Sequence, residues 1–197
     1  MNDPATQQLQ EELALIKKMI SASRRVRAES GDIYLVVGLM LLLAGIVDIS
    51  VATPMSWIAW PISGALGWAY ALISGLRRAH TTKHVSYAPR VEGVAWTVTC
   101  MAAAALAGMY IPTGSLSPDV LFPLMGLLLS IPLAVSGALY RYWPLSAGAA
   151  VFLVSGVVGI WLPPNARGPL FLVSMTLGYI APGIAMLRMS QRPDGSA

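Results

Sequence analysis

The chain has 197 residues, of which 56% are hydrophobic and 11% are charged, whereas a soluble domain carries about 25% charged residues. Too few polar side chains remain to cover a core, so the composition excludes an ordinary soluble globule. The single cysteine, Cys100, excludes an intrachain disulfide and a cysteine-based metal cluster. The net charge of +4 comes from basic residues that flank apolar segments, which indicates membrane topology and no nucleic-acid partner.

The first 32 residues have the pattern of an amphipathic helix. Apolar side chains recur at alternating spacings of four and three residues, and several basic side chains accompany them. We expect this helix to lie on the cytoplasmic membrane surface or to dock on itself, and a separate protein partner or a disordered segment are the alternatives. The residues assigned to this role are Leu9, Leu13, Ile16, Ile20, Lys17, Lys18, Arg24 and Arg25.

Six apolar stretches follow, each about long enough for the roughly 20 residues that cross a bilayer. Prolines such as Pro54, Pro112 and Pro144 mark their boundaries. We therefore expect an all-α membrane protein with a cytoplasmic amphipathic helix over 1–32, six transmembrane helices within 33–188 and a flexible cytoplasmic tail over 189–197. The stretches run from 33 to 51, 55 to 76, 93 to 111, 120 to 139, 145 to 162 and 168 to 187, and the long polar connection runs from 77 to 92.

The distribution of basic residues predicts the orientation of the six helices. Twelve of the 13 Lys and Arg residues fall on one side of the expected membrane, and Arg167 falls on the other. Basic residues concentrate in cytoplasmic connections, so both termini are expected in the cytoplasm.

The apolar part of the chain also has an internal repeat. A shift of 63 residues places Gly45 on Gly108, and a shift of 111 residues places Gly45 on Gly156 and Gly67 on Gly178. The segments 37–77, 100–140 and 148–188 are therefore interpreted as three parallel copies of one helical hairpin.

Small residues recur along the second helix of each hairpin. Such residues let helix backbones approach closely in lipid, where no hydrophobic force joins the helices. We expect these positions to form the inner packing surfaces: Ser63, Gly67, Ala71 and Gly75 in the first copy, Gly126, Ser130, Ala134 and Ala138 in the second, and Ser174 and Gly178 in the third.

The first hairpin contains Gly38 and Gly45 with six residues between them, then Pro54, Gly64 and Gly75. This arrangement resembles the small six-helix acid-resistance proteins of bacterial inner membranes, in which such a hairpin is repeated. The resemblance covers roughly residues 33–188 and leaves the N-terminal helix unexplained. It implies a fold and a location in the bacterial cytoplasmic membrane, and it brings no catalytic residues.

Two polar features of the sequence could have a chemical role. Asp48 is the single acid inside the apolar stretches, and it is interpreted either as an interfacial or helix-end acid or as a proton or cation site. His80 and His84 are four residues apart in the expected loop, where a third metal ligand is not apparent. We therefore expect no metal and no cofactor, and a modest response of the histidines to pH is the alternative.

The expected function follows from these features. We expect a non-enzymatic membrane protein that associates with itself or with a membrane or cytoplasmic partner, in envelope stress or regulation. The alternative is a small transporter or channel. Ion-coupled carriers usually bury charges near the midplane of the membrane, and the apolar stretches of this chain have none there, so the solute is expected to be uncharged or lipophilic.

Overall fold

The computed structural model describes residues 31–51, 58–81, 87–106, 108, 113–114 and 118–190. Over these ranges the protein is helical and contains no strand, which confirms the all-α prediction. The helices are Gly31–Ser50, α2 (Ala59–Thr81), α3 (Tyr87–Ala105), α4 (Pro118–Leu139), α5 (Trp143–Trp161), α6 (Pro164–Met175) and α7 (Ala181–Ser190), and the π-helical segment η3 (Thr176–Ile180) joins α6 to α7.

Four helical segments in the described ranges are long and apolar enough to cross a membrane. These are Gly31–Ser50, Val120–Leu139, Trp143–Trp161 and Pro164–Met189, with mean hydropathies of 1.8 to 2.4. The helices α2 and α3 have 23 and 19 residues, so their length suffices. Glycine, hydroxyl and aromatic residues lower the hydropathy of α2, and Arg90 and Glu92 lower that of α3, so neither helix is among these four segments. The six-span count and the three-fold repeat stay predictions.

The connection between α2 and α3 differs from the sequence-based prediction. The residues from 77 to 92 were expected to form a polar loop, but α2 continues to Thr81 and α3 already begins at Tyr87. No proline or glycine interrupts the chain directly after Gly75, and Pro89 lies in the first turn of α3, where a missing N–H is tolerated. The correction moves His80 into α2 and Glu92 into the second turn of α3.

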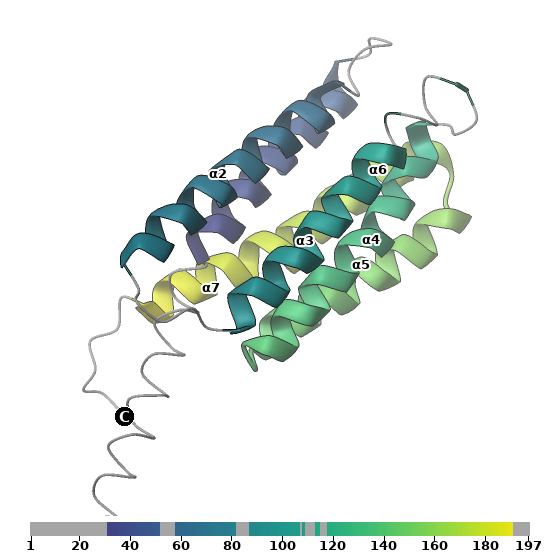
Figure 1. The fold of residues 1–197 in the computed structure, drawn as a ribbon. Coiled ribbons are helices and arrows are strands. Elements are labelled where there is room, and N and C mark those ends of the chain that lie inside the picture. Colours follow the sequence, from purple (N-terminus) through teal and green to yellow (C-terminus); the bar gives the residue numbers. More distant parts are fainter. Residues whose placement is uncertain are drawn as a thin grey trace, which may run out of the picture.

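Glycines determine how closely the Gly31–Ser50 helix approaches the long α6–η3–α7 rod. Gly31, Gly38 and Gly45 are spaced by seven residues, and a Cβ on each would meet Met186, Tyr179 with Ile180, or Leu172, respectively. The two segments therefore pack antiparallel along their length. On its other side the Gly31–Ser50 helix contacts α2, the blue helix beside it in Figure 1.

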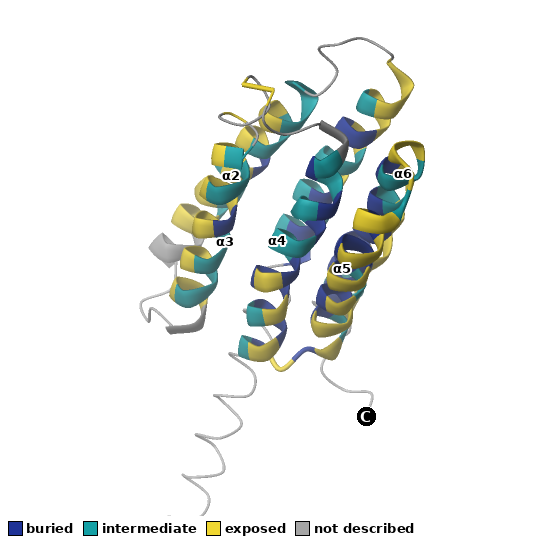
Figure 2. Ribbon diagram, turned by 90° about the vertical axis from the view of Figure 1, so that its right-hand side faces the viewer, coloured by how far each residue is buried: buried dark blue, intermediate teal, exposed yellow. Residues whose placement is uncertain are grey.

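The remaining helices complete the bundle. Among the labelled helices, α4 packs most extensively on α5, and α3 lies against α4. Figure 2 shows buried residues on the inner faces of α4, α5 and α6 and exposed residues on their outer faces. In α5 small or aromatic side chains face inward, as at Gly148, Phe152 and Gly156, whereas valines such as Val154 face outward. This distribution is expected for a helix whose outer face contacts lipid.

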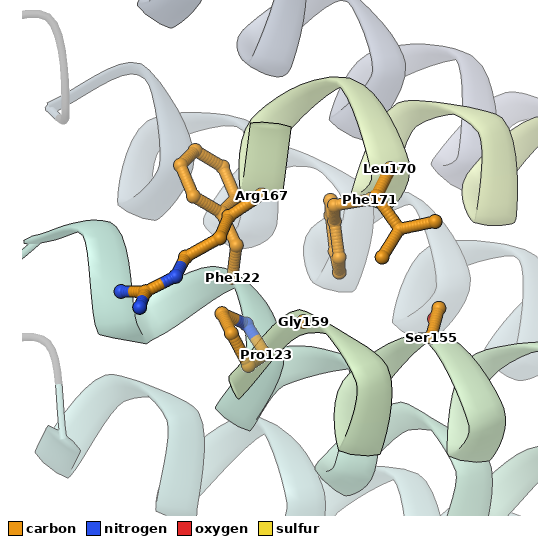
Figure 3. A pocket seen from close by; sticks show the side chains of 7 residues that line it. All are labelled: Phe122, Pro123, Ser155, Gly159, Arg167, Leu170 and Phe171. Carbon is orange, nitrogen blue, oxygen red and sulfur yellow. The ribbon is translucent and has the colours of Figure 1, made fainter. Parts of the chain in front are cut away.

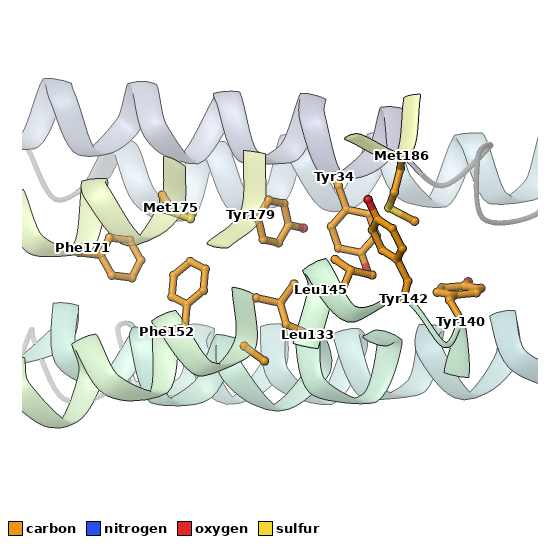
Figure 4. Packing of buried hydrophobic residues seen from close by; sticks show 11 residues of the cluster. Tyr34, Leu133, Tyr140, Tyr142, Leu145, Phe152, Phe171, Met175, Tyr179 and Met186 are labelled. Carbon is orange, nitrogen blue, oxygen red and sulfur yellow. The ribbon is translucent and has the colours of Figure 1, made fainter. Parts of the chain in front are cut away.

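The core is a row of side chains along the axis of the bundle. Figure 4 shows Phe171 and Phe152 towards one end and Tyr34, Tyr142 and Tyr140 towards the other. We call the end of the bundle with the three tyrosines the tyrosine end. Because the helices alternate in direction, this end also carries Arg77, Arg90, Arg141 and Arg188. The opposite end carries Asp48 and Arg167.

Candidate functional site

A half-buried carboxylate at the tyrosine end accepts hydrogen bonds from three hydroxyl groups. Oε1 of Glu92 accepts from the Tyr34 hydroxyl at 2.7 Å and from Ser136 Oγ at 2.9 Å. Oε2 accepts from the Tyr140 hydroxyl. All three donors are buried, at 0% to 4% exposure. We call these four residues the Glu92 cluster, and it links α3 to α4 and to the Gly31–Ser50 helix.

The donors around Glu92 suit an ionised carboxylate. A carboxylate has about four acceptor positions and no proton to donate, and three positions are occupied. Hydrogen bonds to a charged group contribute about 1.5 to 3 kcal/mol each. The partners of this carboxylate are neutral hydroxyls, and no Lys or Arg of the described ranges pairs with it, so hydroxyl groups solvate its charge.

Aromatic rings pack directly beside the Glu92 cluster. The ring of Tyr34 lies edge-on to Trp96 with 6.1 Å between ring centroids, and it lies 5.2 Å from Tyr179. Trp96 is one turn after Glu92 in α3, and its ring is perpendicular to Tyr179 at 5.6 Å. Such edge-to-face pairs stabilise by about 0.5 to 1.5 kcal/mol beyond their buried area. The cluster is therefore held by both polar and aromatic contacts.

A tight turn between α4 and α5 positions Tyr140. Arg141 adopts a left-handed conformation with φ of 48°, and the N–H groups of Arg141 and Tyr142 donate to the carbonyls of Ala138 and Gly137. This hydrogen-bond pattern is a Schellman motif, which usually has glycine at the left-handed position. The turn reverses the chain directly after Tyr140, whose buried ring carries the hydroxyl that reaches Glu92.

Asp48 and Asp32 also accept hydrogen bonds from aromatic side chains. Asp48, half-buried near the end of its helix, accepts a hydrogen bond from Trp60 Nε1 at 2.9 Å. Asp32 caps the N–H of Ile33 at 2.8 Å and accepts from the Tyr70 hydroxyl at 3.3 Å. These two contacts tie α2 to the Gly31–Ser50 helix near both of its ends. Asp48 thus lies in an interhelical hydrogen bond, and both interpretations of this acid stay predictions.

The expected packing positions have different environments in the structure. Gly126, Ser130, Ser174 and Gly178 are buried, and Gly126 approaches the backbone of Gly156 in α5. Among the four positions in α2, Gly67 lies against Val37, whereas Gly75 has open space around it. Ser63 and Ala71 are half-buried, and Ala134 and Ala138 are exposed.

Hydroxyl groups inside the bundle mostly bond to their own helix. Ser130, Ser155 and Ser174 donate to carbonyl oxygens three or four residues earlier, at 2.7 to 3.0 Å. Thr176 does the same at the first position of the π-helical segment. These groups satisfy local backbone acceptors and do not converge on a common point.

A small cavity lies near the end opposite the tyrosine end (Figure 3). Its volume of about 10 Å³ corresponds to roughly one water molecule. Arg167 borders it and donates from Nε to the carbonyl of Leu162 at 2.9 Å, which satisfies an acceptor just after the last turn of α5. Phe122, Pro123, Ser155, Gly159, Leu170 and Phe171 complete the lining.

The sequence did not identify Glu92 as a site residue. It was assigned to a loop at the edge of an apolar stretch, where acids are usually solvated. The available signal was its position one turn before Trp96, which places an acid and an aromatic side chain on the same helix face. Its three hydroxyl partners are 44 to 58 residues away in the chain, so local pattern did not reveal them.

Other predicted features lie outside the described ranges. These are residues 1–30 of the amphipathic helix predicted over 1–32, His84, and residues 191–197 of the tail predicted over 189–197. Within the described ranges, no three His, Cys, Asp or Glu side chains gather as metal ligands would. No family model matches the sequence, and neither curated proteins nor solved structures match it.

Proposed function

We propose that the chain is a non-enzymatic integral membrane protein that acts through association with itself or with a membrane or cytoplasmic partner. The process served by this association is proposed to be envelope stress or regulation. The proposal follows the resemblance of its hairpins to the acid-resistance proteins of bacterial inner membranes. Six spans arranged as three hairpin repeats, with both termini in the cytoplasm, are part of the same proposal.

Open glycines on α2 and α3, the two long helices that are not among the four most apolar segments, carry this proposal. An added Cβ at Gly64 or Gly75 of α2, or at Gly93 of α3, would meet no atom of the described residues within 4 Å. Glycines in α4, α5 and η3 instead contact neighbouring helices, as Gly148 contacts Gly178. Small residues on a helix in lipid permit close contact with another helix. The open positions therefore support a contact with a second copy of the chain.

Exposed tryptophans support the proposed position of the membrane. Trp143 and Trp161 begin and end α5, and they are 77% and 84% exposed. A helix of 19 residues is about 28 Å long, close to the roughly 30 Å hydrocarbon core. Tryptophan is enriched at both interfaces of a bilayer. These residues fit a bilayer whose two surfaces lie at the two ends of α5.

A transporter or channel for an uncharged or lipophilic solute is the alternative function. It requires a path through the bundle that admits the solute. The cavity beside Arg167 accommodates about one water molecule and lies at one end of the bundle, so it does not favour this alternative.

Two substitutions in α2 test the association proposal. Gly75→Leu adds a side chain in open space and is expected to lower the mass of the oligomer in detergent, measured by light scattering, without lowering the unfolding temperature. Gly67→Leu is the matched control, because its Cβ would lie 3.2 Å from Val37, and it is expected to lower the unfolding temperature. A monomeric wild type, or an unchanged mass for Gly75→Leu, would contradict an interface on α2.

A further inference from the structure

The helix α3 is poorly suited to enter a membrane by itself. It has 19 residues, enough to span, yet it is not among the four segments that are apolar enough to do so. It carries the acid Glu92 in its second turn, followed by Trp96 and two threonines. Acids within membrane helices are costly unless other groups of the protein satisfy them.

In the folded protein α3 nevertheless packs in the bundle beside α4 (Figures 1 and 2). Ser136, one of the donors to Glu92, lies three residues before the end of the span Val120–Leu139, about 4.5 Å along the helix axis. The carboxylate is thus bonded at a level inside the apolar segment of α4. Two of the donors, Tyr34 and Ser136, belong to the neighbouring spans, and Tyr140 directly follows the second of them.

We infer that α3 is a conditional membrane span, which crosses the bilayer because Tyr34, Ser136 and Tyr140 supply hydrogen bonds to Glu92. This inference rests on the proposed six-span topology. The physical reason is that a carboxylate without donors would be drawn back to water, whereas three buried hydroxyls replace most of its hydration. The Gly31–Ser50 helix and α4 thereby act as the partners that retain α3.

The wild-type topology is measured first in intact cells. Cys100→Ala removes the native thiol, and a single cysteine is then introduced at Thr113, an exposed position between α3 and α4, or at Ser86, between α2 and α3. A membrane-impermeant thiol reagent is expected to label position 113 and not position 86, and permeabilised cells label both. Absence of labelling at 113 in intact cells would overturn the six-span proposal and this inference with it.

The donors are then removed without changing the carboxylate. The variant Tyr34→Phe/Ser136→Ala/Tyr140→Phe is expected to lose labelling at position 113, normalised to the labelling of permeabilised cells. Adding Glu92→Leu to this variant is the decisive control, because a helix without the carboxylate no longer needs the donors. Labelling is expected to return. The donor variant could also be degraded in the cell. If Glu92→Leu then restores the protein level, this result supports the inference in the same way as restored labelling.

Two results would overturn the inference while leaving the six-span topology intact. Normal labelling of the donor variant would show that α3 spans without the three hydroxyls. Loss of labelling or of protein that Glu92→Leu does not reverse would show that the hydroxyls act through general packing.

Discussion

Three acids in this bundle accept hydrogen bonds from aromatic or hydroxyl side chains of other helices or turns. Asp48 accepts from Trp60, Asp32 from Tyr70, and Glu92 from two tyrosines and a serine. Tyrosine and tryptophan combine a large apolar surface with one polar atom, so they can bury their rings and still reach an acid. These contacts therefore join helices through hydrogen bonds between acids and aromatic or hydroxyl side chains.

Replacing Glu92 tests the contribution of its cluster to stability. Glu92→Ala leaves three buried hydroxyls without their acceptor, and it is expected to lower the free energy of unfolding by about 1 to 3 kcal/mol or more. Glu92→Gln retains one acceptor oxygen and is expected to lower it less. The measurement is unfolding in detergent, followed by circular dichroism.

Thr97→Ala is the control for Glu92→Ala. The Thr97 side chain is exposed on the same helix and donates to the carbonyl of Gly93 in its own helix, so its loss is expected to change stability little. Equal effects of the Thr97 and Glu92 substitutions would contradict a stabilising role for the Glu92 cluster.

At the scale of elements, the contact between α5 and the α6–η3–α7 rod depends on the absence of side chains. The π-helical segment Thr176–Ile180 precedes Pro182, which has no N–H to donate. The Gly178 carbonyl is directed at Gly148, where even a Cβ would overlap it. Two helix backbones therefore touch at this point, which requires glycine at position 148.

Adding one methyl group at this contact is expected to destabilise the bundle. Gly148→Ala places its Cβ against a backbone carbonyl that cannot rotate away, so a loss of about 1 to 3 kcal/mol is expected. Gly108→Ala is the control, because a Cβ at this position meets no atom of the described residues within 4 Å, and it is expected to change the stability little. Thermal unfolding of both variants in detergent distinguishes them, and equal unfolding temperatures would contradict the contact.

At the scale of the whole molecule, the core described within residues 31–190 runs from Tyr34 to Met186. The amphipathic helix predicted over 1–32 has apolar side chains whose exposure to water would cost about 1.5 to 3 kcal/mol each. We expect a membrane surface or another chain to cover them.

Deletion of residues 1–28 tests the role of this segment. The truncated protein is expected to insert and fold, with unchanged helical content, while its oligomeric mass or its co-purifying partners change. Light scattering in detergent and affinity purification measure the two effects. Identical mass and partners would leave the segment as a membrane-surface anchor and would remove it from the association proposal.

The sequence by itself determined the helical class, the order of the apolar segments and most of their boundaries. These properties depend on local composition, because apolar length and proline positions act within one segment. The predicted ends of α2 and α3 were wrong for the same reason. Charged residues were taken to mark the end of a helix, although a helix can continue through them.

Only the tertiary structure decided which side chains meet. Gly67 and Gly75 belong to one predicted ridge, yet one packs against Val37 and the other lies in open space. Glu92 was indistinguishable from a solvated loop acid until donors from two other helices were placed around it. Such contacts join residues 44 to 58 positions apart, and they depend on how the helices pack, which the pattern within each segment does not encode.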